Sequence, residues 1–315
     1  MKTILTIDGG GIRGIIPAMA LQSIEKRLRA KTGQLFDMIA GTSTGGILGS
    51  ALSVGIPATQ VLGMYKEHGP FIFHRSLGWT LKTANGHNGP KYPSVALRTA
   101  LRSVLGPLTM RHVDNPLMLT AWDLTRESTV FIKSWHNQST SLVDACLATS
   151  AAPTYFAPHQ MPRSDSALAD GGLYCNNPTA AAHASAIKLW PGEDIHVISI
   201  GTGLKPPPEN PISWARACSL GKVRWIAIAI EAMMQGQSQA VHYQMTQQLG
   251  DRYTRLQIAT DCMEMDNASQ SNMEDLREVG KALSMSPVYK KVLRTLKLRR
   301  LNRKLSEHRD YVTFT

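Results

Sequence analysis

The sequence predicts a three-layer α/β/α fold with a largely parallel central sheet. Short apolar runs of strand length alternate with longer stretches of helical periodicity over the first two hundred residues. Several of these apolar runs end in glycine-rich turns that precede a helix. Parallel strands joined by helices need cover on both faces of the sheet, which gives the three layers.

The N-terminal part of the chain begins this alternation. Residues 4–7 form a short buried strand, and residues 15–30 form a helix whose apolar side chains share one face. Residues 35–40 form a second strand, and a turn leads from it into a helix over residues 45–54. Another helix begins at Pro57, because proline is favoured in the first turn of a helix.

The middle of the chain contains a long irregular segment. Residues 74–93 hold several Gly, Asn and Pro residues and little periodicity, which predicts a loop of the length often found in lids or binding loops. Residues 117–123 and 129–135 follow as paired strands, and residues 142–152 as a helix of small side chains.

The last strands of the core lie before residue 205. Residues 168–170 form a short strand that ends in a turn, and residues 195–200 form a buried strand after an alanine-rich helix. Residues 205–211 are irregular, because their four prolines prevent regular pairing.

The C-terminal part is mostly helical, with one further strand at residues 253–258. We expect a core over residues 1–205, and residues 206–315 to pack on it rather than form a clear second domain.

The composition narrows the choice of partner. A chain of 315 residues can form one large domain or two small ones. A net charge of +11 favours an anionic partner such as a membrane surface, a nucleic acid or a phosphorylated ligand. A basic protein without such a partner is an equally good interpretation of the charge alone.

The cysteines and the apolar runs indicate where the protein acts. The four cysteines are far apart and form no Cys-x-x-Cys pair, which argues against a structural zinc site and a disulfide framework. The N-terminal apolar run is too short for a signal peptide, and no apolar run could span a bilayer. We therefore expect a cytoplasmic protein that contacts the inner face of the membrane only peripherally.

The most informative segment is Gly41-Thr42-Ser43-Thr44-Gly45, a Gly-x-Ser-x-Gly pattern between a strand and a helix. A sharp turn in this context exposes the serine at the end of the sheet as a nucleophile. The same pattern also occurs in plain turns. It follows only the second strand here, whereas the nucleophile of an ordinary α/β-hydrolase lies well inside the chain.

A glycine cluster, Asp8-Gly9-Gly10-Gly11-Ile12-Arg13-Gly14, follows the first strand. Its Gly-x-Gly-x-x-Gly spacing fits the dinucleotide-binding template. That template requires an acidic residue at the end of the second strand, and this chain has Gly41-Thr42-Ser43 there. The alternative is a loop whose N–H groups point at a developing oxyanion.

A serine nucleophile needs a base. The histidines downstream lack a convincing position: His159, His183, His196 and His242. Asp170 is the better candidate, because it ends a strand and two glycines follow it. A turn-capping role is an equally simple interpretation of an Asp-Gly pair.

Taken together, the glycine cluster, the Ser43 turn and Asp170-Gly171-Gly172 resemble the patatin-like phospholipase family. Further segments match: Thr149-Ser150-Ala151-Ala152-Pro153-Thr154-Tyr155-Phe156, Asn176-Asn177-Pro178 and Ser199-Ile200-Gly201-Thr202-Gly203. The resemblance covers residues 3–205 and implies a patatin-like fold with that segment as the catalytic core. It also implies a Ser43–Asp170 dyad, with Gly41 and Gly45 flanking the turn.

The resemblance further implies an oxyanion hole formed by Gly9, Gly10 and Gly11, with Ile12 and Arg13 as additional donors. The family cleaves acyl esters, chiefly of glycerophospholipids, through an acyl-enzyme, and needs no metal and no organic cofactor. Some members in bacterial anti-phage defence are activated by a cyclic nucleotide, which is a further expectation for this chain.

The C-terminal residues 290–309 contain nine basic side chains with interleaved leucines. This pattern predicts a basic amphipathic helix that could lie on an anionic bilayer. An ordinary surface helix is the competing interpretation. Nucleic acid is a poorer partner, because the stretch has one aromatic residue near its start, Tyr289, and no stacking platform. The sequence is compatible with a homo-oligomer and with a monomer.

Overall fold

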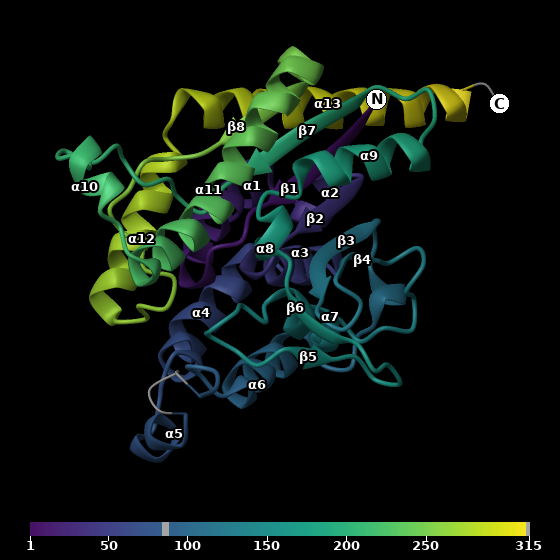
Figure 1. Cartoon of the computed structure of the whole chain (residues 1–315). Helices are drawn as coiled ribbons and strands as arrows, with labels where there is room; N and C mark the ends of the chain where they lie inside the picture. Colours follow the sequence, from purple (N-terminus) through teal and green to yellow (C-terminus); the bar gives the residue numbers. More distant parts are fainter. Residues whose placement is uncertain (84–87, 313–315) are drawn as a thin grey trace.

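The computed structural model describes residues 1–83 and 88–312, apart from the side chains of residues 223, 226–227, 230–231 and 303–312 (Figure 1). The described residues form one mixed sheet, in the strand order β5-β6-β3-β2-β1-β7-β8, with β4 paired to β3. The strands are β1 (Lys2–Ile7), β2 (Met38–Gly41), β3 (Leu117–Asp123), β4 (Ser128–Lys133), β5 (His159–Gln160), β6 (Ala167–Asp170), β7 (Ile195–Ile200) and β8 (Tyr253–Leu256).

The centre of the sheet is parallel and one side is antiparallel. The pairs β2–β3, β1–β2, β1–β7 and β7–β8 are parallel. The pairs β3–β4, β3–β6 and β5–β6 are antiparallel. The predicted largely parallel sheet is therefore confirmed, with an antiparallel side that the strand–helix alternation did not indicate.

Helices cover both faces of this sheet. They are α1 (Ile15–Leu28), α2 (Thr32–Leu35), α3 (Thr44–Ser53), α4 (Ala58–Ile72), α5 (Leu77–Lys82), α6 (Ser94–Leu105), α7 (Leu142–Thr149), α8 (Gly172–Cys175), α9 (Thr179–Leu189), α10 (Trp214–Cys218), α11 (Lys222–Leu249), α12 (Gln270–Leu283) and α13 (Pro287–Val312). Short 3-10 turns occur at Gly11–Gly14, Met110–His112 and Gly250–Arg252.

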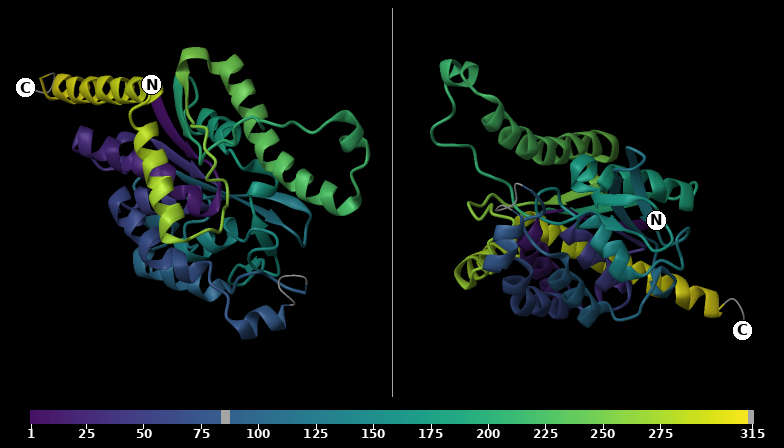
Figure 2. Two further views of the ribbon diagram at one scale, coloured as in Figure 1. Left: turned by 90° about the vertical axis from the view of Figure 1, so that its left-hand side faces the viewer. Right: turned by 60° about the horizontal axis from the view of Figure 1, so that its bottom comes forward.

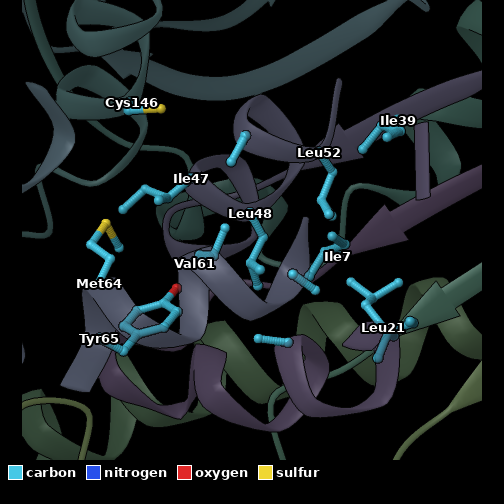
Figure 3. Close-up of a cluster of buried hydrophobic side chains, with 14 of the residues drawn as sticks. Ile7, Leu21, Ile39, Ile47, Leu48, Leu52, Val61, Met64, Tyr65 and Cys146 are labelled. Carbon is cyan, nitrogen blue, oxygen red and sulfur yellow. The ribbon is translucent and has the colours of Figure 1, made fainter. Parts of the chain in front are cut away.

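Two apolar cores define the three layers. Alternate side chains of β1 divide between them, with Leu5 and Ile7 in the larger core and Ile4 in the smaller one. The larger core joins the sheet to α1, α3, α4, α6, α7 and α12. Figure 3 shows part of it, where Ile7 and Ile39 of the strands lie in one cluster with Leu48 and Leu52 of α3. The smaller core lies under α9 and α11.

Several predicted bounds differ from the structure. The predicted strand over residues 35–40 begins only at Met38, because residues 32–35 form the helical turn α2. The predicted long loop over residues 74–93 contains α5, whose first turn is capped by Ser76 Oγ accepting from the Trp79 N–H at 3.2 Å. Residues 84–87 of that loop, and hence part of the predicted lid, lie outside the described residues.

The C-terminal part adds more than helices to the core. Strand β8 extends the sheet beside β7, and α12 packs along α1. No helix among the described residues is long and apolar enough to cross a membrane.

Candidate active site

Ser43 lies at the turn between β2 and α3. Its backbone has φ 54° and ψ −123°, a left-handed conformation that is costly for a residue with a side chain. The Ser43 N–H donates to Thr149 Oγ1 at 3.0 Å, and the Ser43 carbonyl accepts from the Ile47 N–H at 3.0 Å. These bonds hold the strained turn and fix Ser43 at the start of α3.

The glycines on either side of Ser43 permit this turn. A Cβ on Gly41 would lie 2.2 Å from the Gly45 carbonyl oxygen, and one on Gly45 would lie 2.2 Å from the Ile7 carbonyl oxygen. Any side chain at either position would push β1, β2 and α3 apart. Both glycines are therefore required by the close approach of these elements.

Asp170 ends β6 and faces Ser43. Its carboxyl is only 4% exposed and receives the Gly172 N–H at Oδ1, over 2.7 Å. Burial raises the pKa of Asp170 to about 6, although hydrogen bonds from the Ser43 hydroxyl and the Gly172 N–H lower it. Among the described residues, no cation forms an ion pair with this carboxylate. It is thus a base that is largely ionised at neutral pH.

The glycine cluster after β1 lies next to Ser43, and most of its N–H groups are already used. Those of Gly9, Ile12 and Arg13 donate to the carbonyl oxygens of Asn176, Met265 and Gly10, at 3.1, 2.8 and 3.2 Å.

The N–H groups of Gly10 and Gly11 have no such acceptor within the described part of the chain, and both residues line a cavity with Ser43. Gly11 has φ 59°, which favours glycine, and a Cβ there would lie 2.1 Å from the Met265 carbonyl oxygen.

Residue Met265 also bears on the dinucleotide interpretation. Its carbonyl oxygen accepts the Ile12 N–H and lies against Gly11, so this segment fills the space beside the loop. A pyrophosphate on the helix N-terminus would need those same groups. The loop geometry therefore does not favour a dinucleotide.

A cavity of about 300 Å³ opens beside Ser43 and Asp170. Its walls are mainly apolar and come from α3, α4, α6, α11 and the segment after α7. The inner part is formed by Ile47, Met64, Tyr65, Ile72, Leu97 and Phe156. Figure 3 shows Ile47, Met64 and Tyr65 close together at the edge of the core. The shape and lining suit a long apolar group.

A buried ion pair that was not predicted from the sequence lies next to the glycine cluster. Arg255 of β8 donates to both carboxylate oxygens of Asp8, at 2.7 and 2.5 Å, and also to Ser199 Oγ at 2.7 Å. Burial lowers the pKa of Arg255, but the Asp8 carboxylate raises it by more, so the guanidinium stays charged. No local signal could identify this pair, because its members lie 247 positions apart.

The histidines lie away from the cavity. His159 Nε2 is 3.0 Å from Asp144 Oδ1, and His242 Nδ1 is 3.3 Å from the Tyr253 hydroxyl. Burial lowers the pKa of both, and likewise those of His183 on α9 and His196 on β7. In the residues that the structure describes, no histidine lines the cavity, and no cluster of three or more His, Cys, Asp or Glu could hold a metal ion.

Comparison with known proteins supports one family. Residues 5–183 match the family model described as "Patatin-like phospholipase". "Patatin-like protein 1" of Arabidopsis thaliana is 31% identical, over 90% of this chain and 81% of that protein. "Patatin group J-1" of Solanum tuberosum is 30% identical, over 92% of this chain and 85% of that protein.

Among solved structures, VipD from Legionella pneumophila aligns with a TM-score of 0.42 at 11% identity, covering 89% of this chain and 67% of that one. So distant a similarity adds nothing to the family assignment.

Proposed function

This chain belongs to the patatin-like phospholipase family and is a lipid acyl hydrolase, and we propose that it cleaves carboxylic esters of membrane phospholipids with a Ser43–Asp170 dyad. The observation that carries the proposal is the buried Asp170 carboxylate, bonded to the Ser43 hydroxyl and to no cation among the described residues. A carboxyl group with a pKa about 6 is a stronger base than a solvated one, yet is mostly ionised at pH 7.

In the first half of the reaction, Ser43 Oγ attacks the ester carbonyl carbon while Asp170 accepts the hydroxyl proton. The carbonyl oxygen becomes an oxyanion, which the N–H groups of Gly10 and Gly11 stabilise. When the tetrahedral intermediate collapses, the ester C–O bond breaks and Asp170 returns the proton to the leaving alcohol oxygen. The acyl group remains on Ser43.

In the second half, water attacks the acyl-enzyme and gives its proton to Asp170. When this tetrahedral intermediate collapses, the bond between the acyl carbon and Ser43 Oγ breaks, Asp170 returns the proton to Ser43 Oγ, and the fatty acid is released. Two oriented backbone donors lower the barrier by several kcal/mol, since removing one oxyanion donor typically costs about 3–4 kcal/mol. The apolar cavity beside the dyad would hold the acyl chain during both halves.

Among the donors that the sequence suggests, this proposal retains Gly10 and Gly11 only. The N–H groups of Gly9, Ile12 and Arg13 are engaged by backbone carbonyls, and they would have to break those bonds to serve. No contact among the described residues favours a cyclic-nucleotide-activated effector or a dinucleotide-binding protein, so neither is proposed.

The test combines covalent labelling with turnover. We expect a fluorophosphonate probe to label the wild-type protein at Ser43. We also expect Ser43→Ala to abolish labelling and to lower fatty acid release from phosphatidylcholine vesicles at least about a thousandfold. Ser103→Ala, on the exposed side of α6, is the matched control and should behave as wild type. Undiminished release by Ser43→Ala would refute the proposal.

A further inference from the structure

Two of the segments that expose large apolar side chains also contribute residues to the catalytic cavity. The first segment, called here the α5 arm, comprises residues 71–83 and exposes Phe71, Leu77 and Leu81. The second, called here the α11 arm, comprises residues 210–233 and exposes Trp214 and Trp225, together with Ile212, Ile228 and Met233. Leu77 is 86% exposed and Trp214 is 83% exposed, so neither contributes to the core.

Both arms border the mouth of the catalytic cavity. Ile72 and Phe73 of the α5 arm line the cavity, as does Met233 at the end of the α11 arm. Met233 is itself 46% exposed and so joins the lining to the outer surface. Figure 2 shows that α5 and α10 both stand out from the body of the molecule. The exposed apolar groups therefore lie on the projecting rim of the site.

The charge of the arms points to an anionic partner. Residues 71–83 contain Arg75 and Lys82 and no Asp or Glu, and residues 210–233 contain Arg216, Lys222 and Arg224 with a single acidic residue, Glu231. All five cationic side chains are exposed. Tryptophan, leucine and an excess of basic over acidic side chains are typical of surfaces that bind anionic lipid.

A second copy of the chain fits these arms less well. A two-fold interface brings the same patch of each subunit together. Five cations would then face five cations, with Glu231 as the single acidic residue of the two arms in each copy. An anionic bilayer has the opposite charge and accepts the exposed apolar side chains.

The basic C-terminal helix α13 is the competing membrane surface. Val292, Leu293 and Leu296 pack into the core. Arg299 forms an ion pair with Asp37 at 2.5 Å, so part of the basic charge is used within the molecule.

The basic side chains within residues 303–309, which belong to the predicted amphipathic helix, are not among those that the structure describes. No described residue of α13 lines the cavity, and in Figure 1 this helix lies at the opposite end of the molecule from α5.

We propose that the α5 arm and the α11 arm together form the surface that docks on an anionic phospholipid bilayer. Docked in this way, the cavity mouth faces the lipid and an acyl chain can enter without crossing bulk water. That the bilayer is also the substrate rests on the proposed phospholipase activity. Docking itself needs no reaction at Ser43.

The first experiment measures docking without catalysis. Ser43→Ala protein is mixed with vesicles of phosphatidylcholine and phosphatidylglycerol at a ratio of about 3:1, and bound protein is separated by flotation. In this background, Leu77→Ser with Leu81→Ser, and Trp214→Ser with Trp225→Ser, should each weaken binding at least about tenfold, since each removes two exposed apolar groups that docking would bury in the bilayer. Lys290→Gln with Lys297→Gln on α13 is the matched control, expected to change binding less than twofold.

The second experiment separates docking from chemistry. With Ser43 intact, the two arm variants should lose at least about tenfold in fatty acid release from the same vesicles. Their hydrolysis of a short, monomeric p-nitrophenyl ester should stay within about twofold of wild type. Failure of the wild-type protein to cleave either substrate would refute the proposed function, whereas flotation would still decide the docking proposal.

Three results would overturn the docking proposal. The first is vesicle binding that survives both arm variants and falls with the α13 variant. The second is loss of activity on the monomeric ester in step with loss on vesicles, which would place the arms in the catalytic machinery or in folding. The third is a wild-type dimer, seen by light scattering, that dissociates in the arm variants while vesicle binding is unchanged.

Discussion

Asp8, which directly follows β1, and Asp170, which ends β6, are both buried aspartates, but only Asp170 lines the catalytic cavity. They are 2% and 4% exposed. Asp8 accepts two N–H bonds from the Arg255 guanidinium, whereas Asp170 accepts from the Gly172 N–H and the Ser43 hydroxyl. Burial alone therefore does not distinguish a structural carboxylate from a reactive one. The distinction comes from whether a cationic side chain is buried beside the carboxylate and forms an ion pair with it.

The ionised carboxylates of Asp8 and Asp170 change the free energy of unfolding in opposite directions. Asp8 stabilises the folded state through its ion pair, whereas the unpaired buried charge of Asp170 destabilises it. Removing one member of a buried ion pair leaves an uncompensated charge, which costs about 3–5 kcal/mol. Asp170 has a pKa about 6 in the folded protein and 3.8 as its ordinary value, so folding favours its protonated form. Its contribution to stability is fully present below about pH 3.8 and is lost as the pH rises through about 6.

The largest effect is expected from Asp170→Asn. The amide cannot accept the Ser43 proton, so kcat on phospholipid should fall at least about a thousandfold. The same variant should unfold at a higher temperature than wild type at pH 8, because it removes a buried charge. Each pKa unit corresponds to about 1.4 kcal/mol, so the gain is at most ~3 kcal/mol.

His159→Gln is the control for this variant, since His159 is a half-buried titratable residue near Asp144 and away from the cavity. Its activity should remain within about twofold of wild type. Full activity of Asp170→Asn, or a large loss in His159→Gln, would reverse the assignment of the base.

The contrast between the two aspartates also shows what the sequence could predict. The Ser43 turn, the glycine cluster and Asp170-Gly171-Gly172 are recognisable because each depends on a local backbone requirement. Strand β7 was predicted to the residue, helix α3 to within one residue and strand β1 to within two for the same reason, since their apolar patterns are local.

Contacts between distant segments could not be read in this way. Arg255 reaches Asp8 across 247 positions, and Met265 reaches the N–H of Ile12 from beyond β8. These contacts decide which loop N–H groups remain available. Helix α5 was missed although Ser76 is a good N-cap residue, because glycine and proline on both sides favoured a loop.

A smaller effect, on stability rather than chemistry, is expected from Arg255→Met. This change leaves Asp8 buried without its cation, so the free energy of unfolding in urea should fall by about 3–5 kcal/mol. The double variant Asp8→Asn with Arg255→Met should recover most of that loss, because no charge is then stranded.

The matched control is Arg252→Met, which breaks the exposed pair with Asp194, 3.2 Å apart. It should cost less than about 1 kcal/mol. If Arg252→Met and Arg255→Met were equally mild, the Asp8–Arg255 pair would have no special role in holding the glycine loop.

The smallest effect is the pH dependence that follows from the pKa of Asp170. Only the ionised carboxylate can accept the Ser43 proton, so kcat/KM should rise with pH to a plateau above about 7. Below the midpoint near pH 6, it should fall about tenfold per pH unit. A monomeric ester is the suitable substrate, because it avoids the titration of lipid headgroups.

The two aspartates are compared most directly when this pH profile is also measured in a variant that lacks the Asp8–Arg255 ion pair. In Asp8→Asn with Arg255→Met, the midpoint should stay within about half a unit of wild type, since Asp170 pairs with neither residue. A shift of the midpoint to near 4 in the wild-type protein would mean that the Asp170 carboxylate is solvated when it acts. Burial would then no longer explain why a lone aspartate suffices as the base.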